Sequence, residues 1–395
     1  MDQDHRGARL LERLARLTNG LTLMRPSHQS APESNVLRDV TVPTGSFNYA
    51  NPRAIHWGAG SLANLGPELN RLQAKRVALV TTRSLVAEEK LLERVRGALG
   101  EAEVAATEVI SQHAPMSEID AAVAHTTEIG VDGIVSLGGG SPIDSAKVIA
   151  VRLADRHGLA YRGLPHVAIP TTLSTAELAG SAGFTNEEGD KAGTRDVRLL
   201  LDSVIYDAEL TLATPMSLWL STGIRALDHA VEGILADGHH PFSDVMSLEA
   251  VRRLFETLPR AKAAPDDVGV RTDNQLAAWF SFTLPSASAN GLSHVMGKQI
   301  GARHSIPHGV TSCLLMPHVM RYVARAQPDR MALIAGATGS GTDAPGDVEK
   351  LIASLGLPQH IADYGIGEPE LRRAADELNG RYPAKDLLGI YLAAL

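Results

Sequence analysis

The chain has 395 residues, of which 44% are hydrophobic and 21% are charged, and its formal net charge at pH 7 is -8. This length predicts two domains, and the composition predicts a globular protein. No apolar run reaches the ~18 residues that would cross a bilayer, and no dense Lys/Arg run suits a nucleic acid. We therefore expect a small-molecule substrate, with neither a membrane nor a nucleic acid as partner.

The single cysteine, Cys313, lies in the apolar run TSCLLM and cannot form an internal disulfide. This position favours a small core residue over a nucleophile. The cysteine count fits a reducing compartment, and we expect a cytoplasmic protein.

The first 36 residues differ from the rest of the chain. LLERLARL (10–17) places leucines at helical spacing among charges, and loop-like SHQSAPES follows. Acidic Asp2, Asp4 and Glu12 argue against a transit peptide. We predict an N-terminal arm over residues 1–36, either packed on a neighbouring subunit or disordered.

Strand-like and helical patterns alternate in the next part of the chain. RVALVTT (76–82), DGIVSL (132–137) and HVAIPTT (166–172) are short apolar, β-branched runs. Helical patterns lie between the first two, in EEKLLERVRGAL and SEIDAAVAHTTEIG. This alternation predicts the α/β class, with a parallel sheet covered by helices, over residues 37–206.

After about residue 206 the strand-like runs stop. The segments LWLSTGIRALDHAVEGILADG, SDVMSLEAVRRLFETL and DNQLAAWFSFTL have helical patterns. We predict an all-helical domain over residues 207–395.

The stretch SLGGGSPIDSAK (136–147) follows a predicted strand and opens a helix. Gly138, Gly139 and Gly140 let the backbone approach another group closely, with free N–H donors. We predict Ser141 as helix N-cap, Pro142 as the first helical residue and Asp144 at the third position of a capping box. A helix N-terminus behind such a turn suits a diphosphate, and the alternative is a tight turn with an ordinary cap.

Hydroxyl side chains follow the next predicted strand. Thr171, Thr172 and Ser174 would leave the same edge of the sheet, where open parallel sheets bind ligands. They suit a ribose or a nicotinamide carboxamide, unless they only satisfy the backbone of a turn. Two such edges favour a dinucleotide.

The strand RVALVTT ends in Thr82 followed by Arg83, without the acidic residue that would select an unphosphorylated ribose. We expect NADPH to be accepted at least as well as NADH, with Arg83 a candidate contact.

Five motifs in this order resemble the iron-containing, group III alcohol dehydrogenase family. They are LGGGSPIDSAK, IPTTLSTAE, KAGTRDVRLLLDSVIYDAELTLATP, GIRALDHAVEG and GLSHVMGKQIGARHSIPHG. Within that family the chain is most similar to the maleylacetate reductase branch. The resemblance implies a dinucleotide domain, a helical domain and a reaction cleft between them, and Lys191 joins the candidate cofactor contacts.

The resemblance also implies a position for a metal site. Metal-dependent members have a histidine in the segment matched by GIRALDHA and two more fourteen residues apart, here His229, His294 and His308. Their fourth ligand, an aspartate four residues before the first histidine, is replaced by Arg225. A guanidinium cannot ligate a cation and would repel it, and the neighbouring Asp228 points ~100° away around the helix from His229.

We therefore expect no tightly bound metal, with these three histidines lining the cavity. The alternatives are core histidines without a catalytic role and a weak three-histidine zinc site. We expect His304 to face solvent or the mouth of the cleft, and Lys298 to be a second cation near the cavity.

Maleylacetate reductases reduce a carbon–carbon double bond conjugated to a keto group in a dicarboxylate. The resemblance implies a homodimeric, NAD(P)H-dependent reductase in which Arg225 and Lys298 bind negative charge on the substrate. A histidine with a pKa near 7 would donate the proton. The alternatives are an aldehyde or ketone reductase of the same family and a non-redox protein that kept the fold. For Arg225, the alternative to substrate binding is a salt bridge to Asp228 or Glu232.

Overall fold

The computed structural model describes residues 52–159, 162–283, 291–380 and 382–395. The predicted N-terminal arm lies outside these ranges. The first part of the described chain forms a six-stranded sheet with the strand order β1-β8-β5-β4-β2-β3. Every pair of neighbouring strands in it is parallel. Its strands are β1 (Ala54–Trp57), β2 (Arg76–Thr81), β3 (Glu103–Val109), β4 (Gly133–Gly138), β5 (His166–Pro170) and β8 (Ser203–Tyr206).

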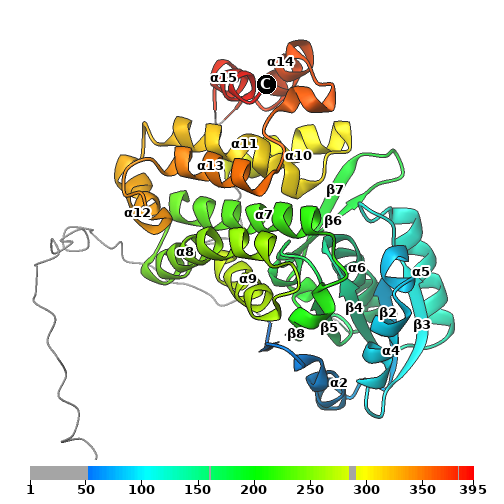
Figure 1. Cartoon of the computed structure of the whole chain (residues 1–395). Coiled ribbons are helices and arrows are strands. Elements are labelled where there is room, and N and C mark those ends of the chain that lie inside the picture. Colours follow the sequence, from blue (N-terminus) through cyan, green and yellow to red (C-terminus); the bar gives the residue numbers. More distant parts are fainter. Residues whose placement is uncertain (1–51, 160–161, 284–290, 381) are drawn as a thin grey trace, which may run out of the picture. The chain divides into compact units, whose positions relative to one another are not determined.

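Helices cover both faces of this sheet (Figure 1). Val77 and Leu79 of β2 pack in the core cluster of α2 and α4, whereas Ala78 and Val80 pack in that of α5 and α6. Burial on both faces explains why the central strands are continuous apolar runs. The helices of this part are α2 (Leu65–Leu72), α3 (Arg83–Val86), α4 (Glu89–Gly97), α5 (Met116–Glu128) and α6 (Gly140–Arg156).

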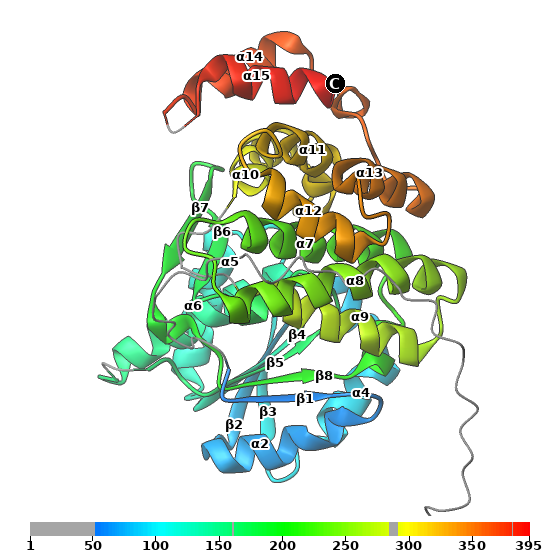
Figure 2. The same ribbon diagram turned by 90° about the vertical axis from the view of Figure 1, so that its left-hand side faces the viewer.

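From Met216 onward the described elements are helices. They are α7 (Met216–Leu235), α8 (Pro241–Ala263), α9 (Val268–Ser281), α10 (Leu292–His304), α11 (His308–Val323), α12 (Pro328–Thr338), α13 (Ala344–Leu355), the short η6 (Ile361–Tyr364), α14 (Glu368–Glu377) and α15 (Ala384–Ala393). Helix α7 is almost wholly buried, and it packs against α8, α9 and α11 (Figure 2). The predicted α/β part followed by a helical part is confirmed.

The sequence analysis identified three strands and missed others. β3 is half-exposed at the sheet edge and carries polar residues, and β1 and β8 have only four residues each. The antiparallel pair β6 (Ser181–Thr185) and β7 (Lys191–Arg195) was also missed, because SAGFT and KAGTR are rich in small and polar residues. Figures 1 and 2 both show β7 beside α10.

Cys313 is buried in the core around α7, as predicted. Burial raises the pKa of its thiol. Among the described residues, no helix is both long and apolar enough to cross a membrane.

Candidate active site

The glycine turn lies at the carboxyl end of β4, beside the end of β5. Gly138 has φ +140°, and a Cβ there would lie 2.7 Å from the Pro142 side chain. A Cβ on Gly139 would lie 3.0 Å from Cγ2 of Thr172. Gly138 therefore requires glycine, and the close approach at Gly139 brings the end of β4 against the hydroxyl-bearing loop after β5.

The predicted cap of α6 is wrong in detail. The helix begins at Gly140, its N-cap is Gly139, and no side chain caps it. The Ser141 hydroxyl instead accepts a hydrogen bond from the His113 backbone N–H at 3.0 Å. Because a glycine at the N-cap leaves the first N–H groups of α6 without a side-chain acceptor, this end of the helix suits an anion.

Asp144 forms no capping box either. Its carboxylate accepts from the backbone N–H of Gly183 at 3.0 Å and from Lys147 Nζ at 3.3 Å. The buried Lys147 also donates to the carbonyls of Ala176, Ala179 and Ser181. These two residues attach the loop after β5 to α6, so the protein already uses the Asp144 side chain.

Two hydroxyls next to the glycine turn have no partner within the described structure. Oγ1 of Thr172 and Oγ of Ser174 are buried without a hydrogen bond. The Ser174 hydroxyl lies 3.6 Å from where a Cβ on Gly140 would be, and Thr171, which precedes Thr172 in the chain, is buried. Since buried hydroxyls are normally paired, these residues fit a polar ligand such as the diphosphate and nicotinamide portions of NAD(P)H.

Thr82 and Arg83 lie at the end of β2, which pairs with β4. The Thr82 hydroxyl caps the short helix α3 by accepting from the backbone N–H of Leu85 at 3.5 Å. Arg83 is exposed. It therefore lies on the same sheet edge as the glycine turn and is accessible to a ligand there.

Lys191 lies at the start of β7 and donates to Oγ1 of Thr185 at 3.3 Å. Burial, and then repulsion from Lys298, lower the pKa of its ammonium group to about 8. Desolvation is the main cause of the lowered pKa of His113 and His308, and the charge of Lys191 lowers both further. This cation therefore lies near the histidine cluster as well as near the loop that contacts Ser141.

The structure brings the three predicted histidines together. His229 comes from α7, His294 from α10 and His308 from the first residue of α11. The ring centroids of His229 and His294 are 6.0 Å apart. Burial and then Arg225 lower the pKa of His229 and His294. The side chain of His308 is exposed, yet desolvation of its ring and then Arg225 lower its pKa to about 3, so all three imidazoles are neutral near pH 7. The expected histidine with a pKa near 7 is therefore not present in this cluster.

Arg225 is buried beside these histidines. Nη2 of its guanidinium hydrogen-bonds to His294, and Nη1 donates to Oδ2 of Asp228 at 3.2 Å and to the Ser312 hydroxyl at 3.0 Å. Asp228 also accepts from Ser293 at 3.0 Å and from Ser312 at 2.7 Å. The salt bridge to Asp228, left open by the sequence, is thus formed, and it compensates the buried charge of Arg225 without a ligand.

Glu232, one turn beyond Asp228, holds the start of α10. Its carboxylate accepts from the backbone N–H of His294 at 2.8 Å, and burial, followed by repulsion from Asp228, raises its pKa. A Cβ on Gly291, the N-cap of α10, would lie 2.5 Å from Cδ of Glu232, so any larger residue there would displace this carboxylate. These contacts set the position of His294 relative to the other histidines.

Lys298 lies one turn after His294 on α10 and is exposed. Burial is the main cause of the lowered pKa of His294, His308 and Lys191, and the charge of Lys298 lowers each further, which puts this charge near all three. Among the residues that the structure describes, no cluster of three or more His, Cys, Asp or Glu side chains is arranged to hold a metal ion.

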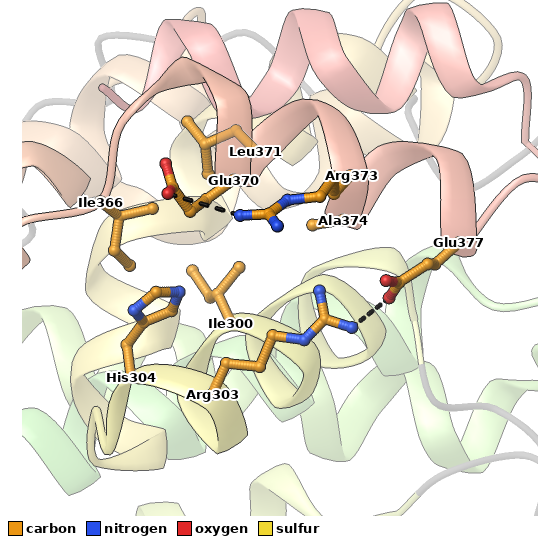
Figure 3. A pocket seen from close by; sticks show the side chains of 9 residues that line it. All are labelled: Ile300, Arg303, His304, Ile366, Glu370, Leu371, Arg373, Ala374 and Glu377. Atoms are coloured by element: carbon orange, nitrogen blue, oxygen red, sulfur yellow. Dashed lines mark hydrogen bonds and ion pairs between the residues drawn. The ribbon is translucent and has the colours of Figure 1, made fainter.

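His304 is at the far end of α10, half-buried in a separate pocket between α10 and α14 (Figure 3). This pocket has a volume of about 230 Å³, and its arginines Arg303 and Arg373 are paired with Glu377 and Glu370. It contains none of the other predicted site residues, and its cations are already compensated.

Thr175 was missed by the sequence analysis, although it lies inside the quoted motif IPTTLSTAE. Its hydroxyl is 3.0 Å from Nδ1 of His229, and its φ of 60° is left-handed. Neither the long-range contact nor the φ value leaves a signal in the local sequence pattern.

Residues 52–208 match the iron-containing alcohol dehydrogenase family, and residues 219–379 match the C-terminal domain of the Fe-containing alcohol dehydrogenase family. A maleylacetate reductase from Pseudomonas sp. (strain P51) is 32% identical over 84% of this chain and 90% of its own length. The chain belongs to the iron-containing alcohol dehydrogenase family.

Solved structures agree with this family membership. The crystal structure of maleylacetate reductase from Agrobacterium tumefaciens is 29% identical, with a TM-score of 0.79 over 89% of this chain and 99% of that one. An iron-containing alcohol dehydrogenase from Corynebacterium glutamicum is 28% identical, with a TM-score of 0.78 over 89% and 98%. The chain is an NAD(P)-dependent oxidoreductase of the maleylacetate reductase-like branch.

Proposed function

We propose that this protein uses NAD(P)H to reduce a carbon–carbon double bond conjugated to a keto group in an anionic substrate, maleylacetate or a close analogue, without a tightly bound metal ion. The observation that carries this proposal is the collection of positive charge around three neutral histidines. Arg225 lies within the cluster, and Lys191 and Lys298 lie near it.

The two lysines support an anionic substrate. Among the described residues, neither Lys191 nor Lys298 forms an ion pair, and they repel each other. A carboxylate between them would relieve this repulsion through charge-assisted hydrogen bonds. We assign the substrate carboxylates to these lysines, because the charge of Arg225 is already compensated by Asp228.

The side chains at the position of the family's metal site support a reaction without a metal ion. In place of a fourth ligand, the cluster contains a guanidinium that hydrogen-bonds to His294. A divalent cation bound by the same imidazole would lie against this permanent positive charge, which disfavours binding. The residues present therefore do not fit the family's iron site, and no step of the proposed reaction uses a metal.

When bound, NAD(P)H supplies a hydride to the alkene carbon, and a proton then adds to the neighbouring carbon. The neutral imidazoles of His229, His294 and His308 can donate N–H groups to the keto oxygen as it gains negative charge. Lys191 has a pKa of about 8, which suits proton donation near neutral pH.

The direct test mixes the purified protein with NADH or NADPH and offers maleylacetate or simple aldehydes. The proposal expects cofactor oxidation with maleylacetate and much slower oxidation with aldehydes. Oxidation by aldehydes alone would make the protein an aldehyde reductase. Enhanced cofactor fluorescence without oxidation by either substrate would indicate a protein that kept the fold and lost hydride transfer.

We further propose a cytoplasmic homodimer, with domains over residues 37–206 and 207–395 and an N-terminal arm before them. Family membership and the single buried cysteine support these assignments. Sedimentation of the full chain tests the dimer.

A further inference from the structure

Thr175 has an unfavourable backbone conformation for its residue type. It follows the loop residue Ser174, precedes the short helix η3 (Ala176–Leu178), and has φ 60° and ψ 16°. A β-branched residue is a marked outlier in this left-handed region, and such strain persists only where the surrounding structure imposes it. Thr175 is also fully buried, so solvent does not stabilise its hydroxyl.

The contact made by this hydroxyl connects two parts of the site. Oγ1 of Thr175 lies 3.0 Å from Nδ1 of His229, which belongs to α7 in the helical part of the chain. Phe282 packs in a T-shaped arrangement against the same imidazole, with ring centroids 5.1 Å apart at 85°. The His229 ring is thus held by one polar and one aromatic contact, and Nε2 is left for another partner.

The backbone around Thr175 is held to the proposed cofactor helix. Lys147 of α6 donates to the carbonyl of Ala176, the next residue, and to that of Ala179 at 2.9 Å. On the other side of Thr175 is Ser174, whose unpaired hydroxyl lies near Gly140. The position of Thr175 is therefore fixed relative to the glycine turn, and through its hydroxyl so is His229.

We propose that Thr175 is a positioning residue, whose hydroxyl holds the His229 imidazole in one orientation and one tautomer relative to the cofactor loop. The left-handed backbone is kept because it aims this hydroxyl at His229. This inference rests on the proposed function only for the role of His229 in turnover.

Thr175→Gly tests the inference, because glycine accepts the same φ but lacks the hydroxyl. Its kcat should fall at least tenfold with a KM for NADPH within about twofold, while Thr175→Ser should retain most of the wild-type kcat. In a His229→Ala background, Thr175→Gly should cause no further loss of kcat, because the effect acts through that ring. The matched control is Gln73→Gly, an exposed position with the same φ of 60° far along the chain, which should leave kcat unchanged.

Two results would overturn the inference: an unchanged kcat in folded Thr175→Gly, or an equal loss in the His229→Ala background. A second readout needs no substrate. Side-chain ¹⁵N NMR of His229 should show one tautomer in the wild type and in Thr175→Ser, and a mixture in Thr175→Gly. If the wild type does not reduce maleylacetate, the proposed function fails, and the NMR result still decides the role of Thr175, since an unchanged tautomer in Thr175→Gly would refute it.

Discussion

At the scale of single residues, Arg225 determines the character of the site. Its guanidinium joins His294 to Asp228 and Ser312, so one side chain orders parts of α7, α10 and α11. The sequence identified the replacement of an acid by a base at this position. It did not identify the partner, because the choice between Asp228 and a bound anion depends on how three helices pack.

Arg225→Met should destabilise the fold by about 3 kcal/mol, because it leaves the Asp228 carboxylate buried without its cation. Urea unfolding measures this loss. The matched control, Arg225→Met combined with Asp228→Asn, should recover much of the stability. The contrary result is that Arg225→Met unfolds at the same urea concentration as the wild type and loses only the turnover of dicarboxylates. Arg225 would then bind the negative charge of the substrate, and the salt-bridge account would be wrong.

The lowered pKa of Lys191 predicts how kcat/KM depends on pH. Its folded-state pKa is lowered to about 8 by burial and by Lys298, so its positive charge is present below pH 8 and lost as the pH rises through that value. His113 and His308 also face this group. For an anionic substrate, kcat/KM should fall above about pH 8, since this ratio reports the free enzyme.

Lys191→Arg keeps its charge at higher pH and should move this fall upward by at least one pH unit. Lys191→Met should lower kcat/KM at neutral pH and abolish the fall. A wild-type profile that is flat to pH 9.5 would remove Lys191 from substrate binding.

At the scale of elements, the carboxyl edge of the sheet was predictable and its loops were not. The apolar strands β2, β4 and β5 and the three glycines after β4 are visible in the sequence, because buried parallel strands are continuous apolar runs. The start of α6 was misplaced, because SerPro looks like a helix start while the glycines already form the first turn. Lys147 was overlooked, because its carbonyl partners are about 30 residues away in the chain.

The residues at the end of β2 predict whether the enzyme prefers NADPH or NADH. Thr82 and the exposed Arg83 provide no carboxylate to repel a 2'-phosphate, so kcat/KM with NADPH should be at least comparable to that with NADH. Arg83→Ala should lower the NADPH value several-fold and leave the NADH value within about twofold. A strong preference for NADH that survives Arg83→Ala would contradict this assignment.

At the scale of the whole molecule, the order of an α/β part and a helical part followed from where strand-like runs stop, and the structure confirms it. The contacts that join these parts at the site could not be predicted in the same way. The Thr175–His229 pair spans 54 residues and depends on a left-handed threonine. Residue types in a motif specify candidate ligands, whereas their orientation depends on tertiary contacts.

The central claim is that this member of an iron-containing family reduces its substrate without a metal, and the most direct measurement is maleylacetate-dependent oxidation of NADPH before and after removal of metal by a chelator. Elemental analysis of the same samples gives the metal content, and Arg225→Asp, which restores the acidic ligand position, is the matched variant. We predict much less than one iron or zinc per wild-type chain, unchanged turnover after chelation, and increased metal binding in Arg225→Asp. About one metal ion per wild-type chain, with activity lost on its removal and restored on its return, would contradict the account.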